Sequence, residues 1–168
     1  MRKRLLLAVL ATILCLSPGL ALGQTGGGAA LPDAAYSGLD AEKDTLHLNT
    51  IGAFSAGFVL QAYGYIGVLA DVLYKEVYAP DLVRTMLGET VTYMRNVNAQ
   101  LLKYRSGPPI AQGDLEFIAA IMEIINHLIA EAEALSSFTQ TKSDSDLRRY
   151  DEARNNAWKS IQKTFKVK

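Results

Sequence analysis

Four long segments with helical periodicity, separated by short loop-forming runs, constrain this chain more than any other feature. The clearest segment is 114–138, where apolar residues recur every three or four positions from Phe117 to Leu135. This spacing places them on one face of an α-helix, whereas a half-buried strand would alternate apolar and polar residues. Runs such as Ser-Gly-Pro-Pro at 106–109 separate the segments. Four such helices with short connections predict an all-α fold, an antiparallel up-down-up-down four-helix bundle.

The punctuation between the segments predicts where the helices begin and end. We expect them to span about 46–78, 81–105, 114–138 and 144–166. Pro80 and Asp81 suit a first turn, where proline is tolerated and a carboxylate meets the positive end of the helix dipole. Ser143 to Asp146 resembles a capping box for the last helix. The alternative is that Pro80 kinks one long helix instead of starting a new one.

The start of the chain has the pattern of an export signal. Three basic residues at 2–4 precede an almost wholly apolar run at 5–16, and small residues occupy positions −3 and −1 of a cleavage site after Gly23. This pattern is typical of a secretory signal peptide covering 1–23, and it predicts a periplasmic or secreted protein. An uncleaved membrane anchor is the alternative, but the apolar run is short for a membrane span.

The segment after the leader predicts a tether followed by one domain. Residues 24–40 are rich in Gly and Ala, so we expect a flexible linker before a bundle at 41–168. Cys15 is the single cysteine and lies in the leader, which leaves a cysteine-free mature chain. Disulfides, thiolate zinc sites and thiol nucleophiles are therefore excluded, and the domain must rely on its apolar core.

Charge is unevenly distributed along the chain. The 17 basic and 17 acidic residues balance, but the leader contains three of the basic ones, so the predicted mature chain carries −3. Residues 142–168 hold 8 basic and 4 acidic residues. An acidic body neutralised by a basic last helix explains this asymmetry without an external partner. The basic stripe is also short, so we expect no nucleic-acid partner.

The first helical segment is unusual because residues 49–70 carry no charge. Its length reaches that of a membrane span. Its glycines and polar groups, and Asp71 close behind, favour a buried bundle helix over membrane insertion. A helical wheel places most large residues on one side and small residues on the other. We expect close packing of a neighbouring helix against the small side, because proteins rarely leave voids. The alternative is a ligand pocket, whose candidate residues are Gly57, Leu60, Gly64 and Gly67.

Arg154 lies at the centre of the apolar stripe of the last helix. A buried guanidinium needs an acidic partner, because an isolated buried charge is costly. Asp71, at the end of the small-residue stripe, is the partner that we expect. Such an ion pair would set the register of the two helices. An anion site built on Arg154 is the alternative.

One acidic stripe on the third helix has spacings that metal sites use. It comprises Glu116, Glu123, His127 and Glu131. A di-metal bundle, however, needs inward carboxylates from several helices. The first three of these residues lie opposite the apolar face, so we expect a solvated surface and no bound metal, with Glu123 and His127 as weak candidates. The chain has no Gly-x-Ser-x-Gly elbow, phosphate-binding glycine loop or His-Glu-x-x-His motif. We therefore expect no catalysis and no cofactor.

These features predict an exported helical-bundle protein that acts as a non-catalytic binding or scaffolding module of the cell envelope. One alternative is a periplasmic carrier or sensor that holds a small apolar ligand between its helices. A metal-dependent enzyme on the third helix is the other alternative. The expected partner is therefore an unknown protein or a small apolar ligand, and a homodimer formed through an apolar seam stays open.

Overall fold

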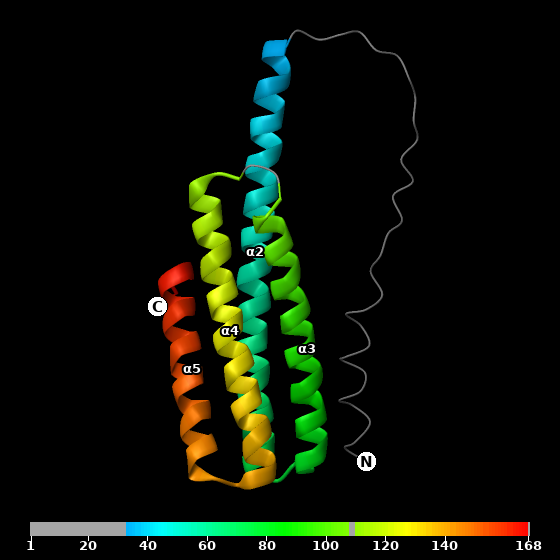
Figure 1. The fold of residues 1–168 in the computed structure, drawn as a ribbon, viewed down its shortest axis with the longest axis vertical. Coiled ribbons are helices and arrows are strands. Elements are labelled where there is room, and N and C mark those ends of the chain that lie inside the picture. Colours follow the sequence, from blue (N-terminus) through cyan, green and yellow to red (C-terminus); the bar gives the residue numbers. More distant parts are fainter. Residues whose placement is uncertain (1–32, 108–109, 168) are drawn as a thin grey trace, which may run out of the picture. The chain divides into compact units, whose positions relative to one another are not determined.

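The computed structural model describes residues 33–107 and 110–167. Within these ranges the secondary structure is four α-helices and no strand. The helices are α2 (Asp33–Tyr74), α3 (Pro80–Arg105), α4 (Gln112–Thr141) and α5 (Asp144–Phe165). Figure 1 shows each helix running antiparallel to the one before it. The expected all-α, up-down-up-down four-helix bundle is confirmed.

The helix bounds lie within three residues of the predicted ones except at both ends of α2. That helix begins at Asp33, so residues 33–40 are helical where a flexible linker was expected. Residues 33–40 contain two alanines and a leucine, which are strong helix formers, against the single Gly38. The rest of the predicted linker and the predicted signal peptide lie outside the described residues.

The C-terminal end of α2 lies at Tyr74 rather than at the expected residue 78. Glu76 adopts a left-handed conformation with φ of 53°, and the backbone N–H of Val77 donates to the carbonyl of Val72 at 2.9 Å. This geometry is a Schellman-type helix end. The left-handed position, which is usually a glycine, is here occupied by Glu76. Pro80 then opens α3, so it separates two helices and does not kink a single one.

The core is built from one face of each helix. On α2 the buried positions follow the expected three- and four-residue spacing from Val59 to Leu73. Phe58 of α2 meets Tyr93 of α3 edge to face, with ring centroids 5.5 Å apart. The largest fully buried apolar side chains include Ile66, Leu69, Leu87, Met94, Ile118, Ile121, Ile124, Ile125, Leu128 and Ile161. All four helices therefore share one apolar core.

One helical stretch in the described part of the chain, Thr50–Tyr74, is long and apolar enough to cross a membrane by length and composition alone. Its mean hydropathy is 1.4, and 28% of the apolar window is buried in the bundle. The same stretch supplies Ile66 and Leu69 to the core. The helix therefore buries one face in the bundle and leaves an uncharged opposite face exposed.

The short connection between α4 and α5 determines which side chains of α5 face α4. Lys142 ends α4 in a left-handed conformation, and the hydroxyl of Ser143 accepts a hydrogen bond from the backbone N–H of Ser145 at 3.1 Å. Asp146, which is buried, accepts a hydrogen bond from the Thr141 hydroxyl at 2.6 Å. The connection thus folds α5 back along α4 and places Arg154 level with the second half of α4.

Candidate functional site

Arg154 reaches from α5 into the space between α2 and α4. Its Nη1 donates to Glu131 Oε1 at 2.6 Å and to the backbone carbonyl of Tyr63 at 3.3 Å. The ring of Tyr63 lies beneath the guanidinium, with its centroid 4.0 Å from Cζ, and stacks on Trp158 at 5.4 Å. Contacts from both α2 and α4 therefore hold the guanidinium in one orientation.

Glu131 is the acidic partner of Arg154, and its side chain is fully buried. Burial raises the pKa of this carboxyl to about 7, because desolvation of the charged form outweighs the attraction of Arg154. Its second oxygen, Oε2, has no hydrogen-bond partner among the described residues. A carboxyl in this state can hold or release a proton near neutral pH.

The expected ion pair between Asp71 and Arg154 is therefore wrong, although Arg154 does have a carboxylate partner. Asp71 instead pairs with Lys75 at 3.2 Å on the protein surface, and its side chain is 71% exposed. The wheel placed Asp71 on the correct side of α2, but it lies a full turn beyond Gly67, the position against which the guanidinium packs.

The glycines of α2 do not serve the purpose that we expected. A Cβ atom built at Gly67 would lie only 2.7 Å from Arg154 Nη2, so this glycine makes room for a guanidinium. Built at Gly57 or Gly64, it would meet nothing within 4 Å. The predicted close approach of a neighbouring helix backbone is therefore wrong at Gly57 and Gly64, and at Gly67 the close neighbour is a side chain.

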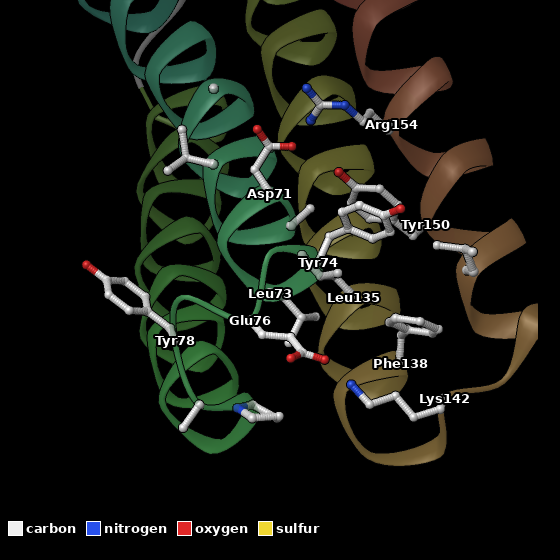
Figure 2. A pocket seen from close by; sticks show the side chains of 17 residues that line it. Asp71, Leu73, Tyr74, Glu76, Tyr78, Leu135, Phe138, Lys142, Tyr150 and Arg154 are labelled. Carbon is white, nitrogen blue, oxygen red and sulfur yellow. The ribbon is translucent and has the colours of Figure 1, made fainter.

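The open space beside Gly64 and Gly67 is part of a groove between α2, α4 and α5, with a volume of about 1250 Å³. Figure 2 shows the groove with Arg154 near one end and Phe138 and Lys142 near the other. Two of the four predicted pocket residues, Gly64 and Gly67, line it, whereas Gly57 and Leu60 do not. The remaining lining residues are Val68, Ala70, Asp71, Leu73, Tyr74, Glu76, Tyr78, Ala79, Pro80, Leu135, Phe138, Lys142, Leu147, Tyr150 and Arg154.

Aromatic rings dominate the middle of the groove. Tyr150 of α5 is largely buried, and its burial raises the pKa of its phenol to about 12, so the hydroxyl stays neutral and can donate a hydrogen bond. Tyr74 is almost fully exposed and lies beside it in Figure 2. Lys142 stands over the Phe138 ring at 5.3 Å. The groove therefore combines an apolar middle with charged groups at both ends.

The sequence argument missed several of these residues. The sequence places Glu131 in a stripe whose other members face solvent. It places Leu135 and Tyr150 on apolar helix faces, without indicating that they line a groove. The eight tyrosines of the chain were a signal, because tyrosine combines a large apolar ring with a polar tip. No pattern in a single sequence indicates which tyrosines share a groove.

The weak metal candidates lie away from this groove. Glu123 Oε1 is 3.8 Å from His127 Nε2 on the outer side of α4. Among the residues that the structure describes, no three His, Cys, Asp or Glu side chains are grouped so as to hold a metal ion.

No protein-family model, curated protein or solved structure matches this chain. Its function must therefore be argued from the groove itself.

Proposed function

We propose that the protein is a non-catalytic binding module that holds a small ligand with an apolar body in the groove between α2, α4 and α5. The observation that carries this proposal is the groove itself, a space of about 1250 Å³ beside the shared apolar core. Ligand sites are typically concave, mostly apolar, and provided with a few convergent polar groups. The signal peptide predicted for 1–23 supports export, so we propose that the ligand is met in the cell envelope.

The chemistry of the walls favours binding over reaction. Leu73, Leu135 and Phe138 offer apolar contact, and Tyr150 offers a ring with a neutral hydroxyl. The side chains that line the described groove include no serine, cysteine or histidine. The carboxyl with a raised pKa, Glu131, lies behind Arg154 and does not line the groove. These groups can hold and orient a molecule through shape, charge and apolar contact.

Two glycines on the same helix provide a matched test. Leucine at either Gly57 or Gly64 would start its side chain in open space, but only Gly64 lines the groove. The neutral probe N-phenyl-1-naphthylamine should therefore fluoresce on binding to the wild type and to Gly57→Leu, and much less with Gly64→Leu. Native mass spectrometry of protein purified from its own host should show a bound mass that only Gly64→Leu loses. The proposal fails if the wild type binds no probe and carries no mass, or if both variants bind alike.

The exposed face of α2 favours a second candidate function, scaffolding through a homodimer. Phe54 is 76%, Val68 58% and Leu60 38% exposed on the uncharged outer side of α2. Leu60 lies about 80° around the helix from Val68. A second copy of this chain fits this face, because two uncharged surfaces meet without like-charge repulsion and a two-fold interface uses one patch twice. Sedimentation equilibrium should then show a dimer that Leu60→Glu dissociates. Leu102→Glu, at an exposed apolar position on α3, should leave it intact. A monomeric wild type would exclude this candidate.

A further inference from the structure

From the charged end of the groove we infer that the ligand has a zwitterionic head group, with its anion on Arg154 and its cation on Asp71, and an apolar body lying toward Leu135 and Phe138. This inference rests on the proposed function and specifies the class of ligand. The same head-group chemistry occurs in two sources, α-amino acids with long apolar side chains and zwitterionic phospholipids.

One side of the Arg154 guanidinium is used in hydrogen bonds within the protein, and the Nη2–Nε edge can bind a ligand. Both hydrogens of Nη1 are used, one by Glu131 and one by the Tyr63 carbonyl. Among the described residues no hydrogen-bond partner is recorded for Nη2 or Nε, and Nη2 lies against Gly67, which lines the groove. The Nη2–Nε edge of a guanidinium matches the two oxygens of a carboxylate or phosphate.

The guanidinium is also held in place before any ligand arrives. The Tyr63 ring supports it from one side, and Glu131 anchors it from the core. The Arg154 side chain is only 28% exposed, so an anion bound there would be partly desolvated. Preorganised donors in a partly desolvated site bind more tightly than mobile surface cations. The opposite end differs, because both Lys142 and Glu76 are exposed.

Asp71 makes a simple anion a poor match for this end of the groove. Its carboxylate and the Arg154 guanidinium both line the groove, and Figure 2 shows them pointing toward the same space from α2 and α5. When Glu131 is ionised, its charge and that of Arg154 cancel. The carboxylate of Asp71 then adds a negative charge beside the head group. Its surface pair with Lys75 is exposed and therefore weak. A head group that carries a cation as well as an anion satisfies both walls, whereas a pure anion is repelled by one of them.

The apolar body then has a defined course. From Arg154 the groove passes Tyr150 and Leu147 of α5 and continues beside Leu135 and Phe138 of α4. Figure 2 shows Arg154, Tyr150, Leu135 and Phe138 following one another along the bundle axis. An unbranched chain attached to the head group would lie along this wall and bury its methylene groups, so that affinity rises with chain length.

Three amphiphiles with the same twelve-carbon chain separate the contributions of the head group. We would measure dodecylphosphocholine, dodecyl phosphate and dodecyltrimethylammonium by isothermal titration calorimetry, each below its micellar concentration. Wild-type protein should bind the zwitterion most tightly. Asp71→Asn lies on the surface and should fold normally. It should narrow the preference for zwitterion over anion by roughly two- to fivefold, the range expected for an exposed charge pair.

The anionic half of the inference needs a variant that keeps the core intact. Arg154→Met alone would leave Glu131 as an unpaired buried charge, so Arg154→Met is combined with Glu131→Gln. This double variant should lose about tenfold or more in affinity for both the zwitterion and the anion, because a hydrogen-bonded charge pair is removed. Binding of N-phenyl-1-naphthylamine, which has no head-group charge, should persist and show that the groove is intact.

The outcomes distinguish the inference from the proposed function on which it rests. If dodecyl phosphate binds the wild type as tightly as dodecylphosphocholine and Asp71→Asn leaves their ratio unchanged, the inference is wrong, although the groove still binds apolar molecules. If neither the amphiphiles nor the neutral probe binds, the proposed function itself fails. Tighter binding of 2-aminododecanoic acid than of dodecylphosphocholine would identify the amino-acid source, and the reverse order would identify the phospholipid source.

Discussion

Raising the pH from 5 to 8 should destabilise the bundle through Glu131, and Glu131→Gln should remove that loss. Burial raises the pKa of this carboxyl from 4.5 to about 7 in the folded protein. The folded state therefore binds the proton more tightly than the unfolded state does. The stability that this proton provides is complete below pH 4.5 and disappears as the pH rises through 7.

The magnitude follows from the two pKa values. A tenfold difference in proton affinity corresponds to about 1.36 kcal/mol, so the full loss is about 3 kcal/mol. Part of it occurs below pH 5, which leaves about 2–3 kcal/mol between pH 5 and pH 8. Glutamine has the shape of the protonated carboxyl and does not titrate. It can still accept the hydrogen bond from Arg154, so the variant should be nearly as stable as the wild type at pH 5.

Urea unfolding followed by circular dichroism at 222 nm, at pH 5, 6, 7 and 8, measures this difference. Contributions common to wild type and variant cancel, so subtracting the two free energies of unfolding isolates Glu131. Glu133→Gln is the matched control, because Glu133 lies two residues further on the exposed side of α4 and pairs with Arg95 at the surface. Its profile should stay parallel to that of the wild type. A constant difference between wild type and Glu131→Gln, or a wild type that gains stability relative to it at pH 8, would refute the reasoning.

Two further predictions concern α2. Gly64→Ala should raise the free energy of unfolding by about 0.5–1 kcal/mol, because alanine favours the helix and its Cβ meets open space. Gly67→Ala should not show this gain, because its Cβ displaces the Arg154 guanidinium. Urea unfolding of both variants checks this, and equal gains would contradict the packing of Arg154 on Gly67. Ile66→Ala should cost about 2–5 kcal/mol, since Ile66 is fully buried in the core, and Val68→Ala on the exposed face should change stability by less than about 0.5 kcal/mol. Similar effects at both positions would mean that α2 does not pack with this face inward.

The fold was predictable because apolar periodicity, the position of Pro80 and the acidic residue after it all indicate the same helices. Apolar residues repeat with helical spacing in α3, α4 and α5, and those faces are the buried ones. Pro80 and Ser143 were correctly interpreted as helix starts, because both act through local backbone geometry. Local rules were less useful for α2. Its uncharged sequence gives no polar face to mark the solvent side, and its last turn is closed by Glu76 in a conformation that sequence does not indicate.

Two of the four pocket residues predicted from the sequence line the groove, and the buried partner of Arg154 was missed for a reason visible in α4. Successive residues of an α-helix are rotated by about 100°, so each step of four residues along an acidic stripe turns it by about 40°. Glu123, His127 and Glu131 are four apart, and Glu131 therefore lies about 80° around the helix from Glu123. That rotation carries the stripe from solvent, where Glu123 is exposed, into the core, where Glu131 is fully buried.

Glu131, at the inner end of this stripe, is therefore as suitable a partner for Arg154 by helix angle as Asp71 is. A wheel gives the angle of a side chain around its own helix, but not its height against a neighbouring helix. Both Asp71 and Glu131 have suitable angles, and the connection at Lys142 and Ser143 determines the height by folding α5 back along α4. Arg154 is therefore level with Glu131, and Asp71 lines the groove with only an exposed surface pair to Lys75. The mistaken ion pair and the proposed cation site thus have the same origin, an acid on the correct face of α2 that lies too far along the helix to meet the arginine.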